Sequence, residues 1–111
     1  MNLNKKNIND VLLIVIEEKE ANLSKSDRFK ELVLDEINRG ARKLIISFKN
    51  VEYLDSSFLG ALVAILKNLL PVGGRLILTD LNGDIENLFE LTRLDKIFTL
   101  KETLEIALQE S

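Results

Sequence analysis

The chain has 111 residues, 46% hydrophobic and 30% charged, which is enough for one globular domain with a single core. Its 18 acidic and 15 basic residues give a formal charge of −3, and no stretch is strongly basic. Nucleic acid is therefore not an expected partner, because phosphate binding needs a surface rich in lysine and arginine. Cysteine and histidine are absent, which excludes disulfides, thiol catalysis and cysteine-based zinc sites and removes the commonest general base.

The first ten residues are polar and do not have the pattern of a signal peptide. No apolar run approaches the roughly 20 residues that a membrane-spanning helix needs. We therefore expect a cytoplasmic protein without membrane insertion. Residues 1–10 leave two interpretations open, a frayed terminus or a short edge strand.

Four short apolar runs predict β-strands. Residues 11–16 are continuously apolar and branched, which is typical of a strand covered on both faces. Residues 44–48, 75–79 and 97–100 are the other three predicted strands.

Polar residues that can cap free N–H groups indicate where the helices begin. Ser24, with Asp27 three residues later, opens the first helix, and Gly40 ends it. The other helices are expected over residues 57–70 before Pro71, from Asn82, and from Thr99 with Glu102 through Leu108.

Strand and helix thus alternate along the whole chain, which favours right-handed crossovers onto a mostly parallel sheet. The predicted fold class is α/β. We expect a single compact domain over residues 1–111, with a mostly parallel four- to five-stranded sheet and about four helices.

Asp55, Ser56 and Ser57 lie where the chain leaves a strand and starts a helix. The first N–H groups of a helix lack intrahelical partners, and the peptide dipoles add partial positive charge there. A carboxylate or hydroxyl at this point is most often a cap. The same groups would also stabilise a phosphate.

The helix after Ser56 has an apolar arc wider than packing on a sheet requires. Two interpretations stay open: a neighbouring helix covers the surplus, or part of the arc is a docking face. In the second case Phe58 and Ile65 stay partly exposed beside a strip of small residues. The arc contains Leu59, Leu62, Val63, Leu66, Leu69 and Leu70, with Phe58 and Ile65 at its edge, and the small residues are Gly60, Ala61 and Ala64.

Four carboxylates, those of Glu17, Glu18, Asp55 and Asp80, each follow a predicted strand. If they cluster at the carboxyl edge of the sheet, a Mg²⁺ site of a receiver-like domain is a remote alternative. Such a site would also use a lysine on a late strand, and Lys96 and Lys101 only flank the last predicted strand.

Ser56 and Ser57 lack the surroundings of a hydrolase nucleophile. The chain has no histidine to activate them and no Gly-x-Ser-x-Gly elbow around them. We expect no enzymatic activity, no catalytic residue, no metal site and no cofactor.

Residues 53–60, Tyr-Leu-Asp-Ser-Ser-Phe-Leu-Gly, resemble the Asp-Ser-Ser-Gly-Leu-Gly signature of STAS domains, especially bacterial anti-sigma factor antagonists. The resemblance continues through residues 73–78, Gly-Gly-Arg-Leu-Ile-Leu. It also includes residues 88–98, which are similar to the family segment Leu-Thr-Gly-Leu-Asp-Lys-Ile-Phe.

The resemblance implies a phosphorylation-switched regulator of a sigma factor, and hence of transcription. Such proteins bind an anti-sigma factor that is also a serine kinase, which phosphorylates the serine after the signature aspartate and is then released. Ser56 is the matching phosphoacceptor and Ser57 the second choice; a serine phosphatase would restore binding. The expected partner-binding residues are Asp55, Ser57, Phe58, Leu59, Gly60, Ala61, Ala64 and Ile65, and a homodimer stays open.

The chain departs from the family pattern at three places. Phe58 replaces the signature glycine, residues 17–23 replace the common Gly-Glu-Leu-Asp, and Arg93 replaces the glycine after Thr92. The alternative function is therefore a STAS interaction module that is not phosphorylated and docks in a larger regulatory or transport assembly.

Overall fold

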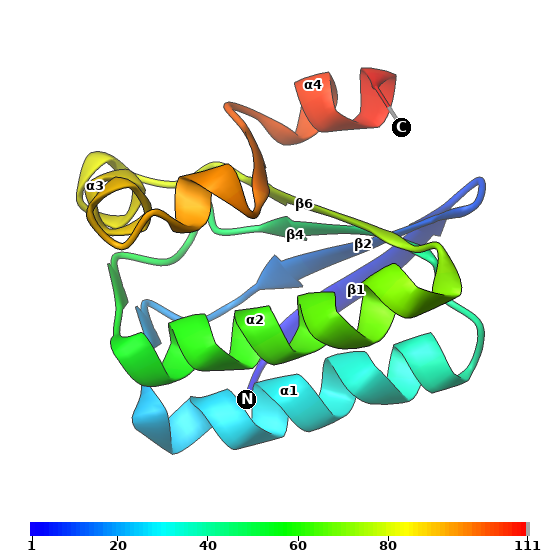
Figure 1. The fold of residues 1–111 in the computed structure, drawn as a ribbon, viewed down its shortest axis with the longest axis horizontal. Helices are drawn as coiled ribbons and strands as arrows, with labels where there is room; N and C mark the ends of the chain where they lie inside the picture. The colour runs from blue at the N-terminus through cyan, green and yellow to red at the C-terminus, as the bar shows by residue number, and fades with distance from the viewer. Residues whose placement is uncertain (111) are drawn as a thin grey trace.

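The computed structural model describes residues 1–110, which form an α/β fold around a five-stranded sheet (Figure 1). The strand order is β1-β2-β4-β6-β7. β1 pairs antiparallel with β2, and the other pairs are parallel. The strands are β1 (Leu3–Ile8), β2 (Val11–Ile16), β4 (Lys43–Ser47), β6 (Arg75–Thr79) and β7 (Thr99–Lys101). The predicted fold class is confirmed, and residues 3–8 form the edge strand that the sequence left open.

Helices cover both faces of this sheet, giving three layers. α1 (Leu23–Asn38) and α2 (Ser56–Leu69) lie side by side on one face, whereas the short α4 (Leu104–Gln109) lies on the other (Figure 1). α3 (Gly83–Leu91) lies near the end of the sheet at which β4 and β6 finish. Short 3₁₀ turns, η1 (Leu70–Val72) and η2 (Leu94–Lys96), follow α2 and α3.

The alternation of side chains along β2 explains why all six of its residues are buried. Leu12, Ile14 and Ile16 belong to the larger core, beneath α1 and α2. Val11, Leu13 and Val15 belong to a smaller core with Ala107 of α4. The continuous apolar run therefore reflects a strand whose two faces are both covered by helices, as the sequence predicted.

Two of the predicted helix N-caps, Ser24 and Thr99, are wrong. α1 begins at Leu23 after the extended residue Asn22, and the Ser24 hydroxyl instead donates a hydrogen bond to the Asn22 side chain. α4 is capped by Thr103, whose hydroxyl accepts from the Ile106 N–H, because Thr99 is already paired in β7. In both cases the residue that ends the extended segment lies a few positions away from the predicted cap.

A second, two-stranded sheet was not predicted. It pairs β3 (Glu20–Ala21) in parallel with β5 (Tyr53–Leu54). Two-residue strands contain too few residues to show a hydrophobic period. This small sheet nevertheless sets the course of the chain into α2.

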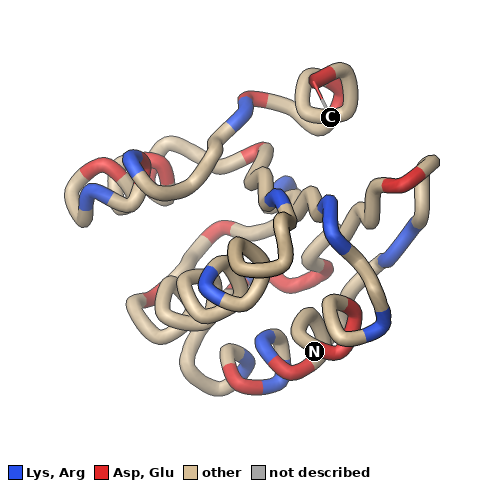
Figure 2. Tube along the Cα trace, turned by 45° about the vertical axis from the view of Figure 1, so that its right-hand side comes forward, with Lys and Arg blue, Asp and Glu red and all other residues tan. Residues whose placement is uncertain are grey.

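Charges of both signs are interspersed along α1 and elsewhere on the trace (Figure 2). Within residues 1–110 no helix combines the length and apolar composition that crossing a bilayer requires.

Candidate partner-binding site at the start of helix α2

The chain reaches α2 through the small β3–β5 sheet. Glu52 and Tyr53 both donate their N–H groups to the Lys19 carbonyl, and Asp55 donates to the Ala21 carbonyl at 3.2 Å. These bonds hold the segment before α2 against the segment before α1. The first turn of α2 is therefore placed by contacts that involve residues more than thirty positions earlier in the chain.

Asp55 is the N-cap of α2 and also supports the start of α1. Its Oδ1 accepts the Phe58 N–H at 3.0 Å, and its Oδ2 accepts the Leu23 N–H at 2.8 Å. One carboxylate thus satisfies a free donor at each of two neighbouring helix starts. The predicted capping role of Asp55 is confirmed, while its second bond, across 32 residues, gave no sequence signal.

Ser56 is the first residue of α2 and is exposed, whereas Ser57 is half-buried. Within residues 1–110 the Ser56 hydroxyl makes no hydrogen bond, and the capping position is occupied by Asp55. Ser56 is therefore the more accessible of the two serine hydroxyls at this helix start.

The interpretation in which Phe58 and Ile65 stay exposed is wrong. Both side chains are 0% exposed, and the Phe58 ring lies 4.6 Å from the ring of Phe29 in α1. Helix α1 covers the surplus apolar arc, as the alternative interpretation held. Two further expected partner-binding residues, Leu59 and Ala61, are buried as well.

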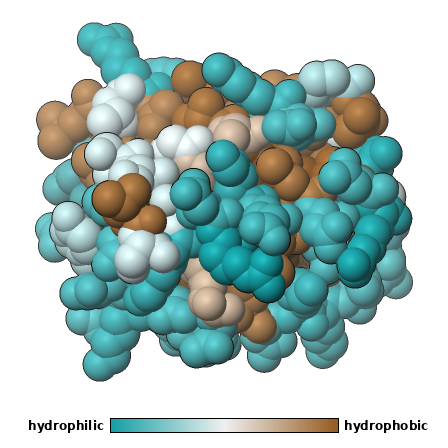
Figure 3. All heavy atoms as spheres, turned by 90° about the horizontal axis from the view of Figure 1, so that it is seen from below, coloured by the Kyte–Doolittle hydropathy of each residue, from teal (hydrophilic) through white to brown (hydrophobic). Residues whose placement is uncertain are grey.

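The accessible part of the expected site is a narrow strip along α2. Ser56 and Gly60 are exposed, and Ala64 is half-buried one turn further on. A methyl group built on Gly60 would meet no atom within 4 Å, so packing within the domain does not require glycine there. The face seen from below is mostly hydrophilic, with hydrophobic side chains in separate areas (Figure 3).

A groove of about 460 Å³ opens beside Ser56. Of its lining residues only Asp55 and Ser56 were among the predicted site residues. One wall comes from residues 52–56 and the other from Asp84, Ile85 and Leu88 of α3. Asn82 holds the walls together: its side-chain oxygen accepts the Ile85 N–H at 2.9 Å, while its amide nitrogen donates to the Glu52 carbonyl at 3.1 Å. Sequence predicted Asn82 as the α3 cap, and this is confirmed, but not its contact across the groove.

The four carboxylates proposed for a magnesium site do not form one. Glu17 accepts from Asn50, Glu18 from Lys25, and Asp80 from the hydroxyls of Ser47 and Thr79. Asp55 is engaged at the two helix starts. Among residues 1–110 no three acidic side chains gather as a metal ion would require.

The Glu18 carboxylate has its own role at this end of the sheet. Its Oε2 accepts the Asn2 N–H at 2.7 Å, and its Oε1 lies 3.1 Å from the Lys25 ammonium. The hydrogen bond from Asn2, together with Lys25, holds the pKa of Glu18 below its ordinary value. Glu18 is thus a structural clamp between the N-terminus and α1.

Comparison with known proteins gives relatives over almost the whole length. A sequence model of the STAS domain family matches residues 2–107. A proposed anti-sigma factor antagonist of Thermotoga neapolitana is 37% identical over 100 residues, which is 89% of this chain and 88% of the relative.

Solved structures agree. The crystal structure of a proposed anti-sigma factor antagonist from Thermotoga maritima superposes with a TM-score of 0.88 at 32% identity, covering 97% of this chain and 92% of that one. The Bacillus cell fate determinant SpoIIAA in its phosphorylated form has the same fold, with a TM-score of 0.76 at 20% identity and coverage of 98% of both chains.

The order of strands and helices, the capped turn before α2 and these matches all agree with the resemblance seen in the sequence. The chain belongs to the STAS domain family, and its relatives include proteins named as anti-sigma factor antagonists.

Proposed function

We propose that this protein is an anti-sigma factor antagonist whose binding is switched by phosphorylation of Ser56. Its partner is an anti-sigma factor that is also a serine kinase, and a serine phosphatase reverses the switch. The observation that carries the proposal is the placement of Ser56. This residue is exposed at the first position of α2, directly after Asp55, and the Asp55 cap does not bond to the Ser56 hydroxyl.

A phosphate at this position suits the fold. It would add a charge of about −1.5 to −2 beside the N-terminus of α2, where free N–H groups and the helix dipole favour an anion. The domain therefore keeps its structure on phosphorylation. A kinase seated on Ser56 holds its nucleotide close to the new phosphate, so like charges and lost hydration release the partner.

The contact surface consists of the accessible residues around that hydroxyl. Asp55 positions the turn, Ser57 borders it, and Gly60 and Ala64 continue the surface along α2. Because Gly60 and Ala64 have no side chain larger than a methyl group, a partner helix or loop can approach the α2 backbone closely.

Phosphate transfer with the purified cognate kinase and ATP tests the proposal. Intact mass should rise by one phosphate in the parent and in Ser57→Ala, and not in Ser56→Ala. Labelling of Ser56→Ala equal to that of the parent would overturn the assignment. In a pull-down with the same kinase, Ser56→Asp should lose binding that the parent shows.

A second candidate is a STAS interaction module without a covalent switch. It is favoured by the segment that replaces the common family motif after the first predicted strand, because that segment contains β3, which pairs with β5 directly before Ser56. Leu23, whose N–H is held by Asp55, is largely exposed there. A Ser56→Asp variant that binds the partner as tightly as the parent would favour this candidate.

A further inference from the structure

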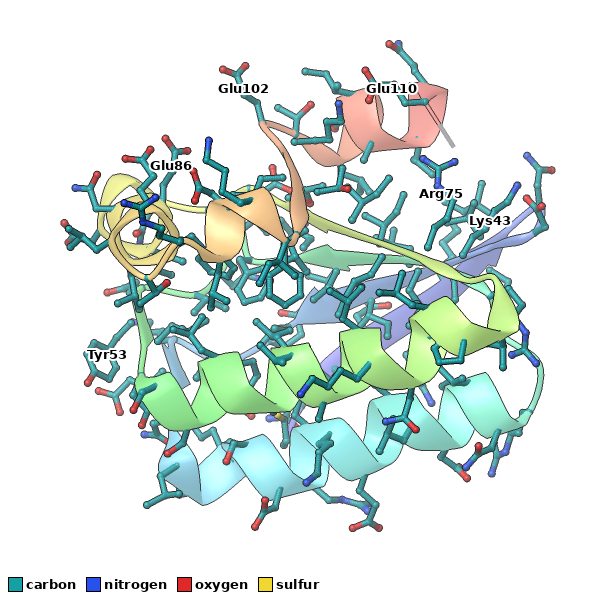
Figure 4. The ribbon with its side chains drawn as sticks, viewed as in Figure 1. Lys43, Tyr53, Arg75, Glu86, Glu102 and Glu110 are labelled. Carbon is teal, nitrogen blue, oxygen red and sulfur yellow. The ribbon has the colours of Figure 1, made fainter. Side chains whose placement is uncertain are left out.

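The groove beside Ser56 has an apolar floor and an acidic rim. Leu54 and Ile85 are buried at its base, and Leu88 is half-buried beside them. Tyr53, 55% exposed, lies between α3 and the first turn of α2 (Figure 4). Leu88 offers accessible apolar area to a visiting side chain above the buried Leu54 and Ile85, and the tyrosine adds an aromatic face at the edge.

The charge of the rim has one sign. Three carboxylates line the groove, those of Glu52, Asp55 and Asp84, and none of its lining residues is lysine or arginine. Asp55 is occupied by two N–H groups. The carboxylates of Glu52 and Asp84 have no hydrogen bond or ion pair within residues 1–110, so both are free to receive a donor from outside.

We infer that the groove binds an arginine-bearing, otherwise apolar segment of the partner protein. A planar guanidinium can donate to Glu52 or Asp84 and stack on Tyr53, while neighbouring apolar side chains fill the floor. An acidic or phosphate-rich occupant would be repelled by the same rim. The inference rests on the proposed function in that the segment belongs to the partner that contacts Ser56.

The groove and the phosphate switch respond differently to charge at Ser56. A negative charge on this residue adds to the rim and does not repel a guanidinium. The arginine contact should therefore survive in Ser56→Asp, whereas binding of the intact kinase is lost through its nucleotide. This difference lets the two proposals fail separately.

Two capped pentapeptides of alternating leucine and arginine, or leucine and glutamine, test the chemistry without a known partner. Titrated into ¹⁵N-labelled protein at about 50 mM salt, the arginine peptide should shift amides of residues 52–56 and 84–88 and bind at least about fivefold more tightly than the glutamine peptide. At about 300 mM salt most of that preference should disappear.

Variants assign the preference to the rim. Glu52→Gln with Asp84→Asn should bring the arginine peptide down to the affinity of the glutamine peptide. The matched control is Glu86→Gln with Glu90→Gln, two exposed carboxylates of α3 outside the groove, and it should keep the preference; Figure 4 shows Glu86 directed away from Tyr53. Shifts elsewhere on the protein, or a preference that survives in the first double variant, would overturn the inference.

The cognate kinase supplies the second measurement. The Glu52→Gln, Asp84→Asn variant should bind it about tenfold or more weakly than the parent does, and the Glu86→Gln, Glu90→Gln variant equally well. If the kinase does not bind Ser56→Asp but binds the Glu52→Gln, Asp84→Asn variant as tightly as the parent, the groove inference is contradicted and the proposed function still stands. If the protein prefers the arginine peptide but no such kinase binds it, the proposed function is contradicted and the peptide chemistry of the groove still stands.

Discussion

The carboxylate of Asp55 connects the first turns of α1 and α2, because it accepts the N–H groups of both Leu23 and Phe58. Asp55→Ala leaves two helix starts without an acceptor, so we expect the free energy of unfolding to fall by about 1–3 kcal/mol. Urea unfolding measures the loss. Asp55→Asn, which keeps one oxygen, should lose less, and Asp27→Ala on the exposed side of α1 should lose little. Equal losses in the two alanine variants would contradict the double-cap role.

Arg93 has a backbone conformation that favours glycine. Its φ of 62° lies in the left-handed region, at the junction between α3 and η2. Arg93→Gly removes the clash of Cβ with the backbone but increases the conformational entropy of the unfolded chain. The net effect should be a rise of about 0.5–1 kcal/mol in the free energy of unfolding.

Arg93→Ala is the matched control, because alanine keeps the Cβ and removes the rest of the side chain. It should give no comparable gain in the same urea titration. A gain of the same size in both variants would assign the effect to the Arg93 side chain beyond Cβ and not to its backbone conformation.

Helix α2 buries one side against α1 and the sheet and leaves a narrow strip for a partner. Gly60 lies in that strip, with no atom within 4 Å of an added Cβ. We expect Gly60→Ala to raise the free energy of unfolding by about 0.5–1 kcal/mol, because alanine is the better helix former. The same methyl group should weaken binding of the cognate kinase if the partner approaches the α2 backbone there.

Gly74→Ala provides the contrast. An added Cβ there would clash with the Leu69 side chain and lie 2.8 Å from the Arg42 carbonyl, so the domain should be destabilised by about 1–3 kcal/mol. Thermal unfolding compares both variants with the parent. Stabilisation by Gly74→Ala would contradict the close packing at Gly74. Kinase binding that is unchanged in Gly60→Ala would contradict a partner contact at Gly60.

The elements that repeat over several turns or strand residues were predictable, and the contacts between distant short segments were not. β2 and α2 have strong apolar patterns, so their type and place follow from sequence. The groove depends on Asn82 donating to the Glu52 carbonyl, 30 residues away. Burial of Phe58 depends on α1 lying parallel to α2 and presenting Phe29, which the period of α2 alone does not specify.

Ser56 and the groove lie at one end of the molecule, where β4 and β6 finish and α2 and α3 begin, and the strip with Gly60 and Ala64 extends from there along α2 (Figure 1). Parallel strands joined by right-handed crossovers bring successive turns to that edge. The same end also holds the N-terminus, through the bond from Asn2 to Glu18.

That bond makes the stability of the whole domain sensitive to acid. The pKa of Glu18 is lowered in the folded state by the Asn2 N–H and by Lys25. A carboxyl whose folded pKa is depressed contributes stability above its ordinary pKa and loses it as pH falls through the folded value. Glu18→Gln removes this contribution, so its deficit against the parent should be about 1 kcal/mol or less near pH 7 and should shrink as pH falls through the folded-state pKa of Glu18.

Urea unfolding of both proteins at several pH values gives the difference directly. Some acid sensitivity should remain in Glu18→Gln, because a hydrogen bond from Lys43 also lowers the pKa of Asp10. Glu31→Gln is the control: it removes a carboxylate from an exposed pair with Arg28 on α1 and leaves the N-terminal contact intact. A deficit of Glu18→Gln that stays constant from neutral to acidic pH would mean that packing of the side chain, and not its charge, holds the N-terminus in place.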